Sequence, residues 1–255
     1  MIVNSLNSLI ITSSNSIFPN TTKKTGVWLE TLATPYYILK DAGEYITIAS
    51  PQGGRIPVDP KSQFIITASE NSMRFQQDAQ AMYHLSHSLP LNEVKVEDYD
   101  LVFVSGGYGC MWDLANNKEL KQILENFNRQ KKPMGLVGHG VVALVSLTKD
   151  NGESLIKGRK LTSFSNSEKE SSPLNGKSIF LLESKLISLG ALYSKGPDFA
   201  SYVVADGNII TGQNPASSGE TARQLLSLAH KKTKLRRSTR AGDMALAEDK
   251  TALNP

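Results

Sequence analysis

Two glycine-rich segments hold the residues whose types and spacing could perform chemistry. Val104-Ser-Gly-Gly-Tyr-Gly109 and Leu136-Val-Gly-His-Gly140 both follow short apolar runs, as loops do where buried strands end. The second has the outline of a nucleophile elbow, in which a tight turn flanked by glycines presents one side chain. The helix after it would aim free backbone N–H groups at an anion or an oxyanion. We therefore predict an anion pocket formed by Gly106, Gly107, Tyr108, Gly138 and His139.

Strands and helices must alternate along the chain to bring these segments together. We predict strands at 8–13, 45–50, 100–105 and 134–137, and a hairpin at 201–212 turned at Asp206-Gly207. Predicted helices cover 25–43, 73–88, 120–127, 141–147 and 181–189, and a last one opens with a capping box at Ser217–Glu220 and ends near His230. This order predicts an α/β protein: a flavodoxin-like, doubly wound, mostly parallel sheet sandwiched by helices, with a small β-hairpin insertion.

The net charge of the chain is concentrated at one end. The 255 residues have a formal charge of +4, yet residues 231–255 contain seven Lys or Arg and three acids, which leaves 21 of each sign in residues 1–230. We predict one domain over 1–230 and a basic, disordered tail over 231–255. The tail could contact an anionic surface such as RNA, lipid or an acidic protein, or remain solvated.

The cysteine content and the apolar runs bear on the compartment. The chain has one cysteine, Cys110, and no run of about 18 apolar residues, so we expect neither a disulfide framework nor a transmembrane helix. The first residues lack the charged start and continuous apolar stretch of a secretory signal. A cytoplasmic protein is the resulting expectation.

Several stretches resemble a known family. Residues 24–37, 49–54, 98–114 and 135–144 are similar to segments of the ThiJ/PfpI superfamily, also described as class I glutamine amidotransferase-like. The resemblance covers roughly residues 8–228 and is nearest to the long branch of chaperone-like and cofactor-free glyoxalase proteins. It implies the same α/β fold, a homo-oligomer, and no cofactor or metal.

The resemblance also implies that three working positions have changed. Active members carry a cysteine at the elbow, where this chain has Gly138, and a glutamate four residues before Pro35, where it has Thr31. The glyoxalase-like branch has histidine at the position of Tyr108. Glycine has no side chain with which to attack a substrate, so covalent cysteine catalysis is not expected.

Other ionisable residues are weaker candidates, and each also has an ordinary structural explanation. His139 could be a surviving base or a pocket-lining group, Cys110 a relocated nucleophile or a buried filler, and Glu30 a pocket carboxylate or a capping residue. Acidic residues at 168 and 170 could support the histidine or lie on the surface. The histidines at 84 and 87 have a helical spacing but no evident third ligand, so we predict no metal site.

Two functions remain open from the sequence. The first is a catalytically degenerate binding, scaffold or chaperone-like module, because Val137–Val141 matches the elbow of glutamine amidotransferase-like class I domain-containing proteins, which act within larger assemblies. The second is a glyoxalase, deglycase or hydrolase with altered chemistry around His139, Glu30 or Cys110.

Overall fold

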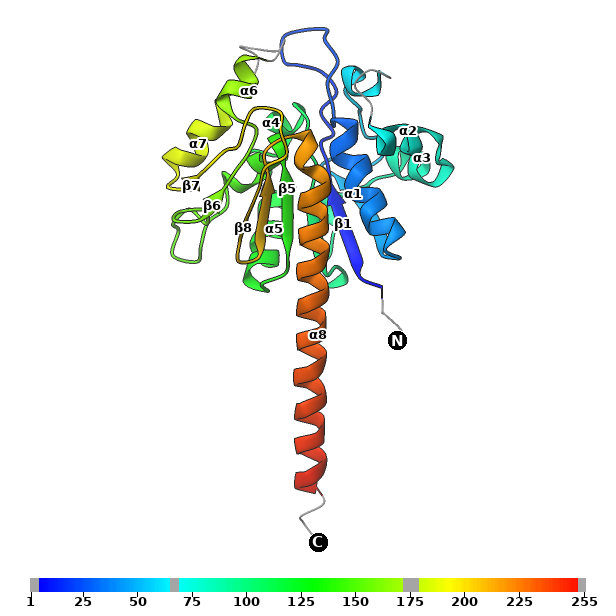
Figure 1. Ribbon diagram of the computed structural model, residues 1–255, viewed down its shortest axis with the longest axis vertical. Coiled ribbons are helices and arrows are strands. Elements are labelled where there is room, and N and C mark those ends of the chain that lie inside the picture. The colour runs from blue at the N-terminus through cyan, green and yellow to red at the C-terminus, as the bar shows by residue number, and fades with distance from the viewer. Residues whose placement is uncertain (1–4, 65–68, 172–178, 252–255) are drawn as a thin grey trace.

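A seven-stranded sheet forms the centre of the computed structural model, which describes residues 5–64, 69–171 and 179–251 (Figure 1). The strand order is β3-β2-β1-β4-β5-β9-β8, and a separate two-stranded sheet pairs β6 with β7. The strands are β1 (Asn7–Ile11), β2 (Tyr45–Ser50), β3 (Leu89–Pro90), β4 (Leu101–Val104), β5 (Met134–Val137), β6 (Lys160–Leu161), β7 (Leu192–Tyr193), β8 (Val203–Asp206) and β9 (Ile209–Gly212).

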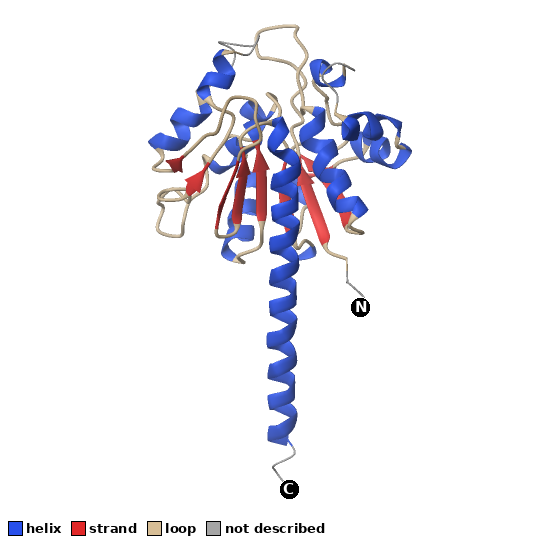
Figure 2. Cartoon of the chain, viewed as in Figure 1, coloured by secondary structure: helices blue, strands red, loops and turns tan. Residues whose placement is uncertain are grey.

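Helices cover both faces of the main sheet (Figure 2). The α-helices are α1 (Leu29–Asp41), α2 (Glu70–Gln77), α3 (Ala79–Ser86), α4 (Cys110–Asp113), α5 (Lys118–Arg129), α6 (Asn166–Glu170), α7 (Leu182–Ser188) and α8 (Ser218–Thr251). The short 3-10 helices are η1 (Pro60–Gln63), η2 (Leu91–Glu93), η3 (Val96–Asp98), η4 (Gly138–Leu144) and η5 (Pro215–Ser217). The predicted α/β fold class is confirmed.

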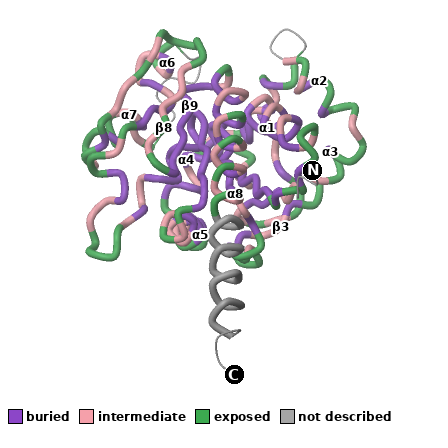
Figure 3. The backbone as a smooth tube through the Cα atoms, turned by 60° about the horizontal axis from the view of Figure 1, so that its bottom comes forward, coloured by how far each residue is buried: buried purple, intermediate pink, exposed green. Residues whose placement is uncertain are grey.

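The central strands separate two hydrophobic clusters. Along β1, Leu9 and Ile11 belong to the cluster with α5 and η4, whereas Ile10 belongs to the cluster with α1 and α8. This alternation follows from the two-residue side-chain period of a strand. Residues buried on both faces therefore lie along the middle of the molecule, where the purple tube is concentrated in Figure 3. The sheet is fixed on both sides, so the loops at its end are held in place.

Two predicted strands have the observed bounds, and the predicted hairpin is confirmed. β2 and β5 begin and end where the sequence pattern places them, and β8 and β9 pair in antiparallel fashion across the Asp206-Gly207 turn. The hairpin is not an insertion, however. Its second strand, β9, pairs in parallel with β5, so the hairpin completes one edge of the main sheet.

The predicted helix over 73–88 is wrong in its continuity, because the structure has two helices that meet at Asp78. The side chain of Asp78 accepts hydrogen bonds from the backbone N–H groups of Gln80 and Ala81 and so caps α3. An aspartate side chain that accepts these hydrogen bonds stabilises an extended backbone at its own residue, and this conformation ends the preceding helix. The predicted helix over 141–147 is likewise replaced by η4, which starts three residues earlier.

The end of the last helix also differs from the prediction. The structure continues α8 to Thr251, so the predicted helix end near His230 is wrong (Figure 1). Residues 231–251 contain no proline and one glycine, Gly242, so no strong helix breaker interrupts them. The capping box also lies earlier, between Asn214 and Ser217. The division into a body and a tail remains a prediction.

None of the helices in the described part of the chain is long and apolar enough to span a bilayer.

Candidate functional site

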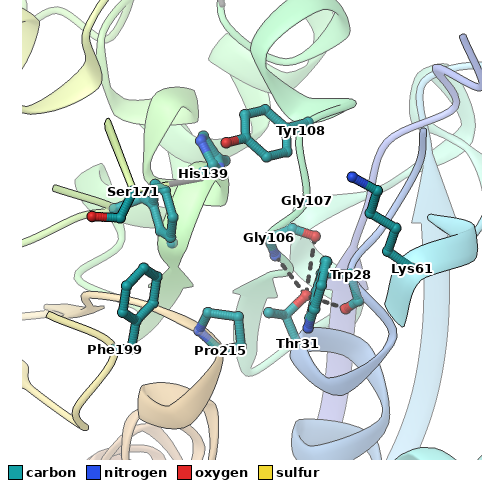
Figure 4. A pocket seen from close by; sticks show the side chains of 12 residues that line it. Trp28, Thr31, Lys61, Gly106, Gly107, Tyr108, His139, Ser171, Phe199 and Pro215 are labelled. Carbon is teal, nitrogen blue, oxygen red and sulfur yellow. Dashed lines mark hydrogen bonds between the residues drawn. The ribbon is translucent and has the colours of Figure 1, made fainter. Parts of the chain in front are cut away.

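A cavity of about 240 Å³ lies beyond the carboxyl ends of neighbouring parallel strands. Gly106 follows β4, Gly138 follows β5, and Pro215 follows β9, while Thr31 lies in the first turn of α1 (Figure 4). The chain proceeds from β1 to β2 on one side and has β4 on the other, so the cavity occupies the switch point where ligands bind in such sheets. It is lined by Trp28, Thr31, Lys61, Gly106, Gly107, Tyr108, Gly138, His139, Phe164, Ser171, Phe199 and Pro215.

All five residues predicted to form an anion pocket line this one cavity. The sequence therefore identified where the two glycine-rich segments meet. Whether the cavity binds an anion remains a prediction. Five of its twelve described lining residues carry aromatic rings, which the glycine-rich loops alone did not indicate.

Thr31 occupies the position of the glutamate expected from the family resemblance, and it has a structural task there. Its Oγ1 accepts a hydrogen bond from the Gly106 N–H at 3.0 Å and lies 2.7 Å from the carbonyl oxygen of Trp28. The side chain is buried. Thr31 thus joins the start of α1 to the loop after β4, and it offers the cavity no acid.

Gly138, at the expected nucleophile position, has the left-handed backbone conformation that an elbow requires. Its φ is +56°, a value at which residues with a side chain are strained. A Cβ built on this residue would meet no atom closer than 4.0 Å, the nearest being the Cα of Asn214 and the carbonyl oxygen of Gln213. This residue therefore has the backbone geometry of an elbow and space for a side chain, but no side chain that could attack a substrate.

His139 lies between two aromatic rings. Its imidazole centroid is 4.3 Å from the ring of Tyr108 and 4.5 Å from that of Phe164. Burial and the nearby positive charge of Lys169 lower the pKa of His139 to about 3, so the ring is neutral near pH 7. The predicted pocket-lining role agrees with this position. In Figure 4, the hydroxyl of Ser171 points away from His139.

Cys110 and Glu30, the two alternative reactive residues, do not line the cavity. Cys110 is fully buried in the cluster beneath α4, and its thiol donates to the carbonyl oxygen of Ser105 at 3.3 Å. Burial and the nearby carboxyl of Asp113 raise the pKa of this thiol, which opposes a thiolate. Glu30 is half-buried, and burial raises the pKa of its carboxyl.

Glu168 supports a neighbouring loop. It is fully buried, and its Oε1 accepts hydrogen bonds from the Phe199 N–H at 2.8 Å and the Asn214 Nδ2 at 2.7 Å. Its Oε2 accepts from the Ser165 N–H at 2.9 Å and completes a capping box on α6. Glu170 is exposed. The possible role of Glu168 in supporting the histidine is therefore replaced by one in positioning the Phe199 backbone.

The two spaced histidines pack against aromatic side chains. His84 makes an edge contact with Tyr36, and His87 stacks on Tyr83 with centroids 4.2 Å apart. In the described part of the chain, no three His, Cys, Asp or Glu residues are grouped so that they could hold a metal ion.

Sequence reasoning missed most of the aromatic lining. Trp28 is in a segment that resembles the family, and Phe164 lies within the overall range of the resemblance, but no role was assigned to either. Phe199 and Lys61 come from loops without a recognisable motif. Phe199 is notable because its φ is +60° and its side chain is 54% exposed. Only the folded arrangement brings these side chains to the glycine-rich loops.

The fold and this cavity define an α/β protein with a ligand site at the switch point of a parallel sheet. The DJ-1/PfpI family matches residues 26–228, and the chain belongs to this family. Glyoxalase 3 of Candida albicans is 27% identical over 230 residues, which span 86% of this chain and 95% of that protein. Glutamine amidotransferase-like class 1 domain-containing protein 1 of Bos taurus is 27% identical over 192 residues, covering 75% and 84%.

A solved structure extends the similarity to the whole fold. The Rapid Encystment Protein 24 kDa of Francisella tularensis superposes with a TM-score of 0.84 and is 33% identical, covering 88% of this chain and 99% of that one. The resemblance seen in the sequence was to glyoxalases and to amidotransferase-like proteins, and both groups are found among the relatives.

Proposed function

We propose that this protein is a non-covalent binding module of the DJ-1/PfpI family, with the cavity as its ligand site. The observation that carries the proposal is the pair of residues at the two working positions. Gly138 has the elbow conformation without a thiol. The hydroxyl of Thr31 hydrogen-bonds to backbone groups of Trp28 and Gly106. Among the described lining residues there is no cysteine, aspartate or glutamate. A nucleophile and its acidic partner are what cysteine catalysis requires.

A glyoxalase activity with altered chemistry is the second candidate. It is supported by the name of the Candida albicans relative, Glyoxalase 3. It is also supported by His139, a neutral imidazole that lines the cavity. This route would need His139 to move a proton on a bound carbonyl compound without a covalent intermediate.

Methylglyoxal turnover by the pure protein separates the two candidates. We expect no turnover by the native chain above that of buffer. Turnover by the native chain that is lost in His139→Ala would overturn the binding proposal and establish the enzyme. The Ser171→Ala variant is the matched control, because it also changes a lining residue.

The vacant nucleophile position allows a second test. The Gly138→Cys variant has room for its side chain, and Thr31→Glu supplies the missing acid. If these two substitutions are what separates the chain from its enzymatic relatives, the double variant gains turnover while each single variant gains less. Turnover of methylglyoxal gained by the double variant supports the proposal that catalysis was lost at these two positions. Turnover by the native chain contradicts it.

We further propose that the protein works in the cytoplasm as a homo-oligomer, in a scaffold or chaperone-like role. The single cysteine supports the compartment. Light scattering on the eluted peak of a size-exclusion column measures the oligomeric state. A mass of one chain, 27.8 kDa, at micromolar concentration would refute the oligomer.

A further inference from the structure

A buried histidine without a hydrogen bond lies in the wall of the cavity, and what it implies for the ligand rests on the proposed binding function. His139 lines the cavity and is only 7% exposed. In the part of the chain that the structure describes, neither of its ring nitrogens has a hydrogen-bond partner, and its contacts are with the rings of Tyr108 and Phe164. Buried polar groups in native proteins are nearly always paired. An unpaired imidazole in this wall therefore indicates that a ligand supplies the partner.

The protonation state of His139 defines the group that can pair with it. Burial and the nearby charge of Lys169 keep the ring neutral near pH 7. A neutral imidazole has one N–H donor and one acceptor nitrogen. A hydroxyl group can accept from the first or donate to the second, so it fits whichever nitrogen faces the ligand. A carboxylate can only accept and an ammonium can only donate, so a hydroxyl is the better match.

The described wall of the cavity gives an ionic ligand no counter-charge of its own. No aspartate or glutamate is among the described lining residues, and the lysine among them, Lys61, acts on the neighbouring carboxylate of Asp59. Burial raises the pKa of Asp59, and the charge of Lys61 opposes this rise. Lys169, whose charge also acts on His139, does not line the cavity. A charged group that entered would lose its hydration without gaining a partner, so an uncharged ligand is favoured.

Rings on two sides of the cavity fit a planar aromatic ligand. Phe164 and Phe199 contact edge to face with centroids 6.5 Å apart, and Trp28 lies across from Phe199 (Figure 4). The buried carboxylate of Glu168 accepts a hydrogen bond from the Phe199 N–H and holds that residue at a φ of +60°. Strained residues that the surrounding structure enforces are concentrated at functional sites. The half-exposed ring of Phe199 would gain both burial and an aromatic contact from a ligand ring.

The volume limits the size of the ligand. A dry cavity of about 150 Å³ accepts benzene. This cavity, at about 240 Å³, has room for a second fused ring. We propose that it binds an uncharged, planar hydroxyarene of one or two rings, whose ring packs between Trp28 and Phe199 and whose hydroxyl forms a hydrogen bond with His139.

Calorimetric titration near pH 7 with 2-naphthol and three analogues of similar size tests the ligand class. 2-Methylnaphthalene replaces the hydroxyl by a methyl group, decahydro-2-naphthol removes the aromatic rings, and 2-naphthoate adds a negative charge. We expect 2-naphthol to bind at least about tenfold more tightly than each analogue, because each leaves a buried group without its match. A smaller ratio for any analogue, or no binding of 2-naphthol, overturns the proposal. Tighter binding of 2-naphthoate would support the anion pocket expected from the sequence instead.

Substitution of His139 tests the hydrogen bond separately from the packing. His139→Phe keeps a ring in the wall and removes both nitrogens, so the preference for 2-naphthol over 2-methylnaphthalene should fall below about twofold. His87→Phe makes the same change at an exposed position outside the cavity and should keep the native preference. An undiminished preference in His139→Phe overturns the assignment. If this variant does not fold, the ratio measured on the native chain still decides.

The packing of the ligand ring is tested at Phe199. Phe199→Ala should weaken the binding of 2-naphthol at least about fivefold, because the ligand loses an aromatic contact and the burial that comes with it. Tyr45→Ala removes an exposed ring at the opposite end of the sheet and should bind as the native chain does. Equal affinities of the two variants would refute the contact with Phe199.

The same preparations separate the ligand class from the proposed function. Methylglyoxal turnover by the native chain contradicts the binding module, whatever binds in the titration. Failure of 2-naphthol to bind selectively, without turnover, overturns the ligand class alone.

Discussion

The hydroxyl of Thr31 accepts a hydrogen bond from the N–H of Gly106 at 3.0 Å, across 75 positions of sequence. It fixes the loop after β4 against the first turn of α1. At Gly106 itself, a Cβ would lie 2.8 Å from the carbonyl oxygen of Val137, so this glycine also permits the close approach of β4 and β5. The position that would carry an acid in an active relative is here part of the frame of the cavity.

Thr31→Val should therefore destabilise the protein although it changes the volume little. The buried Gly106 N–H would lose its acceptor, and a buried unsatisfied donor costs about 1–3 kcal/mol. Urea unfolding followed by circular dichroism measures the effect. Thr34→Val is the control in the same helix, because its hydroxyl makes only a 3.4 Å contact with Asn71. Equal stability of the two variants would contradict the role of Thr31.

Glu168→Gln should be destabilising by about 2–3 kcal/mol, because three donors bond to the two carboxylate oxygens and a glutamine can accept with only one of its two terminal atoms. One end of the glutamine would place an N–H₂ donor against a backbone N–H. Glu170→Gln changes the same residue type at an exposed position and should alter the free energy of unfolding by less than about 0.5 kcal/mol. Similar losses in both variants would refute a specific role for Glu168.

Stability on the acid side should depend on His139. Its pKa is about 3 in the folded protein and 6.5 in the unfolded reference, so the unfolded chain binds more protons between these values. The stability that the neutral ring contributes is complete above pH 6.5 and is lost as the pH falls towards 3. The largest loss is roughly 5 kcal/mol at about 1.4 kcal/mol per pKa unit. Urea unfolding of His139→Phe at several pH values should show a flatter profile, and an unchanged profile would exclude this origin.

Asp113 should have the opposite dependence on pH. Burial raises the pKa of its carboxyl to about 6 from 3.8, even though Ser13 Oγ and the Ser14 N–H donate to it. The folded state therefore binds more protons between these values, and its stability falls as the pH rises from 3.8 to 6. In Asp113→Asn, the free energy of unfolding should fall by up to roughly 3 kcal/mol less over this pH range than in the native chain. Asp150→Asn, whose side chain is 93% exposed, should leave the slope unchanged, and equal slopes in both variants would refute the prediction.

The fold was predictable because its signals are local. β5 is four buried residues bounded by a proline and a glycine, and the stripe formed by Leu120, Ile123, Leu124 and Phe127 predicts the buried face of α5 directly. The break at Asp78 was missed because an aspartate can be either an exposed helical residue or a cap. Its backbone φ and ψ decide between them, and these depend on tertiary packing.

The sequence predicted the part of the site that is formed by backbone turns at glycines, but not the part that is formed by aromatic side chains. Glycines mark close approaches, as at Gly106, and left-handed backbone, as at Gly138, so both residues were found from their neighbours in sequence. The rings of Trp28, Phe164 and Phe199 leave no such mark, because an aromatic residue looks the same in a core as in a cavity wall. The part of Glu168 in holding Phe199 depends on a contact between residues 31 positions apart, which no local pattern reports.

The length of α8 has a mechanical consequence. Its first turns pack on the sheet, where a Cβ at Gly135 would lie 3.0 Å from Leu225, so the direction of the helix is set by close contact with β5. From Lys231 to Thr251 the same helix extends about 30 Å at 1.5 Å per residue (Figure 1). The first part of α8 is thus fixed to the sheet, and the rest of the helix extends beyond it. The far end of α8 therefore lies at the end of the molecule opposite to the cavity, so a partner bound there would be remote from the ligand site (Figure 1).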